Sequence, residues 1–186
     1  MAMQKIRFTD RRRLSVVKNS GWIGEFQFID ISKPRIIAEM SVYQTIKTFD
    51  NYPCSHRQWR HKGHCKFIHG YSRSFKMTFG CEELTESGFG VDFGEFSDIK
   101  SWLSYWFDHT TLINEDDPEL QLFQDLHDKR IVDLRVLPNV SLERTAEFVF
   151  DYVDKWTREQ TNHRSFLLEV ECRENDKNAA IYRLRV

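Results

Sequence analysis

The chain has 186 residues, the size of one domain or of one domain with an extension. Its 27 lysines and arginines nearly balance 28 aspartates and glutamates, which argues against a polybasic nucleic-acid-binding protein. No apolar run reaches the length of a transmembrane helix, and the start of the chain has no apolar core of a secretory signal. Four cysteines without a Cys-x-x-Cys pair are typical of free thiols in a reducing compartment, so we expect a cytoplasmic protein.

The first half of the chain reads as an extension followed by strands and one helix. Residues 1–38 are predicted to be an N-terminal extension, in which residues 21–31 look extended. Residues 35–49 are rich in Ile, Val, Tyr and Thr, and residues 73–82 alternate between apolar and polar side chains, so both predict strands. Apolar residues at steps of three and four between Gly94 and Asp108 then predict a helix.

The second half adds a short insertion, a long helix and a hairpin. Pro118 is placed to open a short helix, and residues 131–137 predict a short strand. Ser141 is a suitable N-cap for the next helix, and strands 165–172 and 179–186 follow as a hairpin. The order predicts an α+β fold in which four antiparallel strands carry two helices on one face. Such a small sheet leaves open edges, which oligomerisation would cover.

Residues able to bind metal concentrate between positions 54 and 71. Four of the seven histidines and two of the four cysteines lie there: Cys54, His56, His61, His64, Cys65 and His69. A metal site needs several such side chains to converge on one point, and His69 and Tyr71, two apart on a strand, face the same way. The alternatives are a structural zinc finger, whose ligands usually come in closely spaced pairs, and a polar loop without any ligand.

Three further positions are candidates for chemistry. Cys65 follows Lys62 and His64, and nearby positive charge favours a thiolate that acts as base or nucleophile; the alternative is a spare thiol. Asp108 beside His109 forms a carboxylate–imidazole pair suited to proton transfer, or else a helix end at which a histidine cation is favoured.

Glu171 lies on the penultimate strand. Alternation predicts that it shares a face with Glu169, opposite Phe166, Leu168 and Val170. If that face lines a pocket, the carboxylate can accept two N–H donors from a ring edge; otherwise it is a solvated strand residue. The acidic run 115–117 is predicted to be a surface turn.

Six motifs, in order from about Phe49 to Tyr182, resemble the 6-pyruvoyl-tetrahydropterin synthase / 6-carboxytetrahydropterin synthase family. They are Cys54-Ser55-His56; Cys65-Lys66-Phe67-Ile68-His69-Gly70-Tyr71; Gly88-Phe89-Gly90-Val91-Asp92-Phe93; Asp108-His109-Thr110-Thr111-Leu112-Ile113-Asn114; Val140-Ser141-Leu142-Glu143 followed by Ala146; and Glu171 before a hairpin that ends in Ile181-Tyr182.

The resemblance implies a tunnelling fold over residues 39–186, in which three chains close their sheets into a barrel and two trimers stack into a homohexamer. It implies 7,8-dihydroneopterin triphosphate as the small-molecule substrate, with neither nucleic acid nor membrane as a partner. Zn²⁺ would bind at His56, His69 and Tyr71 and would acidify the substrate's hydroxyls.

The resemblance also implies roles for other residues. Cys65 would be the general base, and Asp108 with His109 a proton relay completed from a neighbouring chain. Glu171, helped by the backbone near Ser141 and Leu142, would hold the pterin. We expect the branch that forms 6-carboxytetrahydropterin, a queuosine precursor; the alternatives are pyruvoyl synthase activity, a pterin-binding relative without catalysis, and an unrelated zinc-binding interaction domain.

The sequence departs from the family at the third metal ligand, where Tyr71 stands in place of a histidine. A free phenol loses its proton only near pH 10, so Tyr71 would bind zinc as phenolate, His61 or His64 would stand in for it, or no zinc would bind. The N-terminal extension and a longer insertion at 115–137 are further differences, and both are expected either to pack on the hexamer or to alter substrate access.

Overall fold

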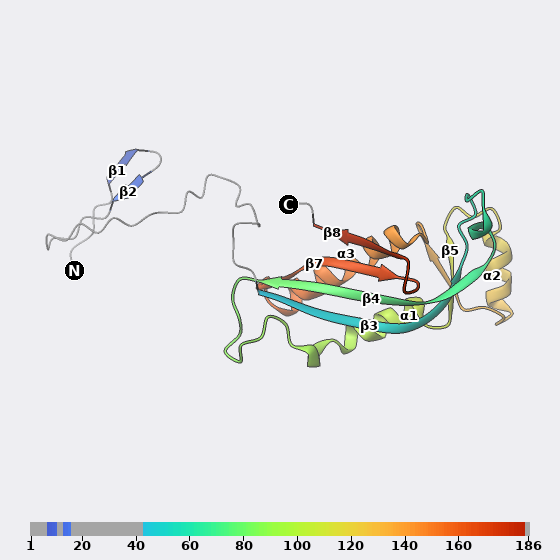
Figure 1. The fold of residues 1–186 in the computed structure, drawn as a ribbon, viewed down its shortest axis with the longest axis horizontal. Coiled ribbons are helices and arrows are strands. Elements are labelled where there is room, and N and C mark those ends of the chain that lie inside the picture. The colour runs from blue at the N-terminus through green and yellow to red at the C-terminus, as the bar shows by residue number, and fades with distance from the viewer. Residues whose placement is uncertain (1–6, 11–12, 16–42, 185–186) are drawn as a thin grey trace. The chain divides into compact units, whose positions relative to one another are not determined.

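The computed structural model describes residues 7–10, 13–15 and 43–184 (Figure 1). The chain divides into two compact units. The first consists of residues 1–40 and residue 186, and the second of residues 41–185. In the first unit β1 (Arg7–Asp10) and β2 (Arg13–Ser15) pair antiparallel. The predicted extended segment 21–31 lies outside the described residues, and the predicted boundary at residue 38 stays a prediction.

The second unit is built on one sheet with the strand order β6-β5-β3-β4-β7-β8. Its strands are β3 (Tyr43–His56), β4 (His69–Cys81), β5 (Thr110–Asn114), β6 (Leu134–Leu137), β7 (Ser165–Arg173) and β8 (Ala179–Arg183). Strands β3, β4, β7 and β8 form the antiparallel part, and β5 and β6 extend it in parallel beside β3.

The predicted α+β class is confirmed, but the prediction of a four-stranded sheet is wrong in number. Strand β5 was missed because all five of its residues are buried, so its sequence shows no alternation of apolar and polar positions. The short strand predicted at 131–137 is present as β6, and it joins the same sheet.

Three α-helices cover one face of this sheet or its end: α1 (Ser97–Phe107), α2 (Leu120–Asp128) and α3 (Leu142–Gln160) (Figure 1). The predicted N-cap of α3 is confirmed, since the Ser141 hydroxyl accepts a hydrogen bond from the Arg144 amide at 3.3 Å. None of the helices in the described ranges has the length and apolar character needed to cross a bilayer.

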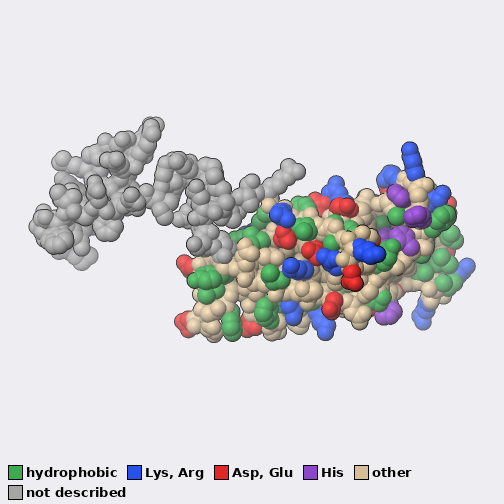
Figure 2. Space-filling view, in the orientation of Figure 1, with side chains coloured by type: hydrophobic (Ala, Val, Ile, Leu, Met, Phe, Trp, Pro, Cys, Tyr) green, Lys and Arg blue, Asp and Glu red, His purple; other side chains and the backbone are tan. Residues whose placement is uncertain are grey.

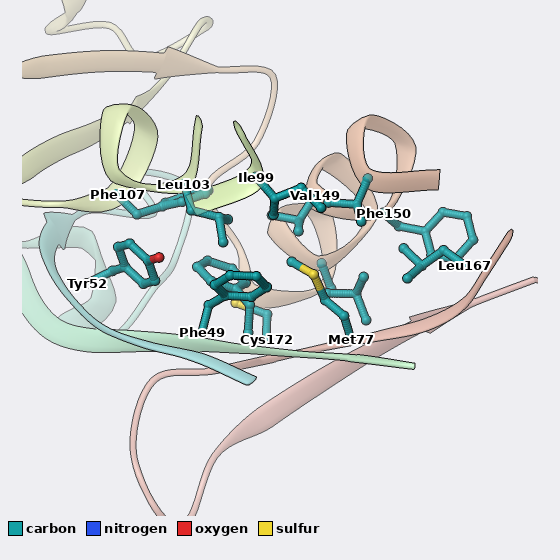
Figure 3. Close-up of a cluster of buried hydrophobic side chains, with 14 of the residues drawn as sticks. Phe49, Tyr52, Met77, Ile99, Leu103, Phe107, Val149, Phe150, Leu167 and Cys172 are labelled. Carbon is teal, nitrogen blue, oxygen red and sulfur yellow. The ribbon is translucent and has the colours of Figure 1, made fainter. Parts of the chain in front are cut away.

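The core lies between the sheet and the helices α1 and α3. On β4 the residues Phe75, Met77 and Phe79 are buried and alternate with polar ones, as the sequence predicts. Register places Phe75 between Phe49 of β3 and Cys172 of β7, which extends the apolar layer across three strands. Figure 3 shows Phe49, Met77 and Cys172 of the sheet facing Ile99, Leu103, Val149 and Phe150 of the helices. Each buried aromatic or aliphatic side chain contributes about 1.5–3 kcal/mol.

A bulge in β7 changes the predicted faces of that strand. Thr78 pairs with Glu169 but Phe79 pairs with Leu167, so Leu168 is the extra residue. A Cβ on Gly80 would meet the side chains of both Phe166 and Leu168, which places these two on the outer face. The prediction that they lie opposite Glu171 is therefore wrong, while Val170 faces the core and so lies opposite Glu171 as predicted.

Candidate metal and substrate site

Three of the predicted site residues come together where β3 ends and β4 begins. His56 and His69 are directly paired across the two strands, and their ring centroids are 4.3 Å apart. The Tyr71 ring lies 6.4 Å from that of His56 and 5.8 Å from that of His69. Figure 2 shows histidine side chains gathered at the end of the body where Figure 1 places the β3–β4 connection and α2.

A bulge in β3 aims His56 into this cluster. The register shifts between Phe49 and Tyr52, and Asn51 has a left-handed backbone with φ +65°. Phe49 faces the core before the bulge, whereas Tyr52 and His56 face it afterwards. Without the extra residue His56 would point to the opposite face of the sheet, away from His69 and Tyr71.

Gly70 allows the two strands to approach closely between His69 and Tyr71. A Cβ at this position would lie 3.0 Å from the Cys54 carbonyl oxygen, which is tighter than side chains normally tolerate. In the local sequence His-Gly-Tyr, His69 and Tyr71 therefore place their rings on one face of the strand. The glycine between them is needed because a side chain there would clash with β3.

Burial keeps His56 uncharged. Its pKa is lowered to about 3, first because burial removes water from the imidazolium and then because Arg73 and His69 add positive charge. Among the described residues its buried Nδ1 has no hydrogen-bond partner. A neutral imidazole with a free ring nitrogen is what a divalent metal requires.

His69 is oriented by the backbone of the preceding loop. Its Nδ1 lies 2.8 Å from the Phe67 carbonyl oxygen. Because a carbonyl can only accept, this nitrogen carries the proton, and Nε2 keeps its lone pair. Metal-binding histidines are commonly held in this way by an outer partner.

The donors at this point are thus two imidazoles and one phenol. In the part of the chain that the structure describes, no three His, Cys, Asp or Glu side chains gather closely enough to hold a metal. The predicted stand-ins His61 and His64 therefore do not complete the set; His61 Nδ1 instead accepts from the Gly63 amide at 3.2 Å. The two histidines fit a zinc ion, with Tyr71 as the third donor only in its phenolate form.

Arg73 lies beside this cluster and was missed at the sequence level. Its side chain is fully buried, with Nη1 donating to Thr145 Oγ1 at 2.8 Å and Nη2 to the Val140 carbonyl at 3.0 Å. No carboxylate of the described residues forms an ion pair with it. The sequence did contain an indication of its burial. Arg73 lies two residues before Phe75 and so shares the core-facing side of β4 with Phe75, Met77 and Phe79.

These two bonds bring the start of α3 to the same side of the sheet. Val140 immediately precedes Ser141 and Leu142, the predicted substrate-binding pair, and Thr145 lies in the first turn. The structure therefore places Ser141 and Leu142 on the helix-covered face that also carries His56, His69 and Tyr71.

Glu171 lies on the other face of the sheet. It pairs with Lys76 of β4, whose neighbours Phe75 and Met77 face the core. Its Oε1 accepts hydrogen bonds from Arg173, at 3.1 Å from Nε and 2.7 Å from Nη2. Within one chain, Glu171 and the histidine cluster are not brought together.

Asp108 and His109 form the predicted pair immediately after α1. Their Oδ1 and Nδ1 atoms are 2.6 Å apart, and the side chain of His109 is 84% exposed. The backbone at His109 is left-handed, with φ +57°, and its amide donates to the Pro53 carbonyl at 2.7 Å. Within the described ranges the pair makes no hydrogen bond or ring contact with His56, His69 or Cys65.

Cys65 lies in the 3-10 turn His64–Lys66 of the loop that joins β3 to β4. It is a free, partly exposed cysteine, whereas the other three are buried. Its carbonyl accepts a hydrogen bond from the Gln58 amide at 2.8 Å, which closes the loop. The thiol is therefore accessible and stands four residues before His69.

Comparisons with known proteins bear on the family and the fold of the chain. The sequence model of the family described as 6-pyruvoyl tetrahydropterin synthase matches residues 45–185. A curated relative, 6-carboxy-5,6,7,8-tetrahydropterin synthase of Rickettsia typhi, is 30% identical over 71 residues. That alignment covers 38% of this chain and 51% of the relative, so the chain spans about half the length of the curated relatives it matches.

Solved structures give the same fold at low identity. An uncharacterized protein of Wolinella succinogenes aligns with a TM-score of 0.66 and 20% identity, over 78% of this chain and 99% of that chain. The 6-pyruvoyl tetrahydropterin synthase of Plasmodium vivax aligns with a TM-score of 0.59 and 14% identity, over the same shares of the two chains.

Proposed function

The chain belongs to the 6-pyruvoyl tetrahydropterin synthase family and has its tunnelling fold, and from this premise we propose that it is a 6-carboxy-5,6,7,8-tetrahydropterin synthase-like enzyme. It would convert 7,8-dihydroneopterin triphosphate and water to 6-carboxytetrahydropterin, triphosphate and acetaldehyde in the cytoplasm. The observation that carries the proposal is the convergence of His56, His69 and Tyr71 inside the matched region. The names of the curated relatives favour the carboxy branch.

His56 and His69 would hold zinc, with Tyr71 as phenolate. Zinc, when bound, would polarise the side-chain hydroxyls of the substrate and make them more acidic. The neutral state of His56 and the oriented ring of His69 support this assignment. The phenolate would also balance part of the ion's charge, which two neutral imidazoles leave uncompensated.

The remaining assignments concern proton transfer and substrate binding. Cys65 is accessible and would take a proton from the substrate's side chain as general base. Asp108 would hold the His109 ring through the 2.6 Å contact, so that His109 can pass a proton on. Glu171 would accept N–H bonds from the pterin edge after exchanging its contact with Arg173, and the start of α3 at Ser141 and Leu142 would complete the binding surface.

Such a site needs more than one chain. Glu171 lies on the opposite face of the sheet from the histidine cluster, and the His109 pair points to solvent. The sheet also has open edges at β6 and β8, which can pair with other strands. We therefore propose the homohexamer, a dimer of trimers, with each site completed by neighbouring chains.

A pterin-binding relative without catalysis is the second candidate. Two observations favour it: Tyr71 is a weaker zinc ligand than an imidazole, and the Glu171 carboxylate is already bonded to Arg173. This candidate predicts pterin binding without turnover.

The test is incubation of the purified full chain with 7,8-dihydroneopterin triphosphate and identification of the product by mass spectrometry. 6-Carboxytetrahydropterin is the expected product; 6-pyruvoyltetrahydropterin would move the chain to the other branch. Cys65→Ala should lower turnover by about 100-fold or more while pterin binding remains, because a general base contributes about 10²–10⁴-fold. Turnover that survives this substitution would remove Cys65 from the mechanism.

A further inference from the structure

The loop that carries Cys65, residues 57–68, is fastened by its first four side chains. Three of them bond to the turn between β5 and α2, and Gln58 bonds to Asn114, the last residue of β5. The pairs are Arg57 with Asp117, Gln58 with Asn114, and both Trp59 and Arg60 with Asp116. This turn opens the 115–137 insertion, whose role the sequence does not explain.

Among these contacts, the buried Arg57–Asp117 pair is expected to be strong and the exposed Arg60–Asp116 pair weak. Arg57 donates to both carboxylate oxygens of Asp117, from Nε at 2.7 Å and from Nη2 at 2.5 Å. The side chain of Asp117 is 0% exposed, so the prediction of a purely surface turn at 115–117 is wrong at this residue. The Arg60–Asp116 pair is 59% and 41% exposed, and solvent screens it.

The second connection runs through Gln58. Its backbone amide donates to the Cys65 carbonyl at 2.8 Å, so the residue that meets the end of β5 also closes the Cys65 loop. Its side-chain oxygen accepts from Asn114 at 2.8 Å, and its side-chain nitrogen donates to Asn139 at 3.2 Å.

The same two asparagines hold the start of α3. Asn114 Oδ1 accepts from the Val140 amide at 2.8 Å, and Asn139 Oδ1 accepts from the Ser141 amide at 2.9 Å. One hydrogen-bonded network therefore joins the Cys65 loop to the segment proposed to bind substrate. Asp117 anchors it from the turn, where it also accepts from the Glu119 amide at 2.9 Å.

We propose that Asp117, acting through Arg57, is a positioning residue that holds the Cys65 loop at a fixed place relative to the start of α3. The inference rests on the proposed function for the role of Cys65, although the fastening of the loop can be measured without it. A base acts only within hydrogen-bond reach of its proton, so a loop shift of about 1 Å is expected to cost on the order of 100-fold in rate.

The test compares Asp117→Asn with Asp116→Asn in the 186-residue chain. The two substitutions make the same change at neighbouring residues, one buried and one exposed. We expect Asp117→Asn to lower kcat by about tenfold or more with KM within about threefold, since it displaces the base rather than the binding surface. Asp116→Asn should leave kcat within about twofold.

A second measurement does not depend on turnover. Iodoacetamide labels accessible thiols, and mass spectrometry reads Cys65 separately from the three buried cysteines. We expect Asp117→Asn to speed Cys65 labelling by about threefold or more, because a released loop opens more often. Arg57→Lys keeps the positive charge but loses the two-point contact, and serves if Asp117→Asn fails to fold.

The outcomes separate the two proposals. If wild type shows no turnover but Asp117→Asn or Arg57→Lys speeds labelling, the proposed enzyme activity fails and the positioning role stands. A folded Asp117→Asn with wild-type labelling and wild-type kcat overturns the positioning role. Equal effects of Asp116→Asn and Asp117→Asn overturn it as well.

Discussion

The two halves of β4 show opposite uses of the same strand face. From Phe75 to Phe79 every residue facing the helices is apolar and buried, and each packs against β3, β7 and the helices. From His69 to Arg73 the same face carries an imidazole, a phenol and a guanidinium. The strand changes from core to candidate site within two residues.

The difference lies in what each half does with polar groups. On the face toward the helices, the apolar half carries only Phe75, Met77 and Phe79, and none of these side chains needs a hydrogen bond. Among the described residues three buried side-chain polar atoms have no hydrogen-bond partner: Arg73 Nε in the polar half, Nδ1 of His56 on the neighbouring β3, and Nε1 of Trp156 in the core. Unpaired buried polar atoms cost free energy, and two of these three lie at the polar half, so the cluster there is maintained at the expense of stability. Function is therefore expected at the His69 end and stability at the Phe79 end.

Phe75→Ala gives the largest expected effect and tests the stabilising half. Phe75 is fully buried and contacts Tyr52 and Phe107, so its removal leaves a cavity in the middle of the layer. We expect the free energy of unfolding to fall by about 3–5 kcal/mol, measured by urea denaturation. Phe67→Ala, at an exposed ring beside the site, is the control and should change it by about 0.5 kcal/mol or less. Similar losses in both variants would contradict the division of the strand.

His69→Ala tests the polar half. Wild type is expected to bind one zinc per chain, and the variant to bind it at least about 100-fold more weakly, since loss of even an outer partner costs about 10–100-fold. Zinc content after dialysis, measured by elemental analysis, gives the result. His61→Ala removes an exposed imidazole that bonds only within its own loop, and it should retain the metal. An enzyme that is active without metal would remove zinc from the proposal.

The stabilising half could be predicted from the sequence, and the polar half only in part. The alternation of Phe75, Met77 and Phe79 with polar residues specifies both a strand and its buried face. His56, His69 and Tyr71 could be selected as candidates by type and spacing. Their meeting depends on the bulge near Asn51, which no local pattern announces.

Other misses have similar physical causes. Strand β5 lacks alternation because both of its faces are covered, and the bulge at Leu168 reverses the face of Phe166. Asp117 looks like a solvated acid until the fold brings Arg57, sixty positions earlier in the chain, against it. Long-range pairing of this kind is decided by tertiary structure, so a single sequence shows the residue types but not the partners.

Cys172 gives the smallest expected effect and tests whether the stabilising half also excludes charge. This thiol is fully buried beside Phe75, and its pKa is raised to about 12, mainly because burial disfavours the thiolate. In the unfolded chain the Cys172 thiol ionises near pH 8.5–9. From about pH 9 upward this thiol therefore loses a proton in the unfolded state that it keeps in the folded state. Unfolding is therefore favoured as pH rises, and Cys172 should remove about 1–2 kcal/mol of stability between pH 8 and pH 10. Cys172→Ala lacks this titration, so its deficit against wild type in urea denaturation should shrink by that amount over the same range. A deficit that stays constant with pH would show that the thiol is reached by water, and that the apolar half is less closed than its packing indicates.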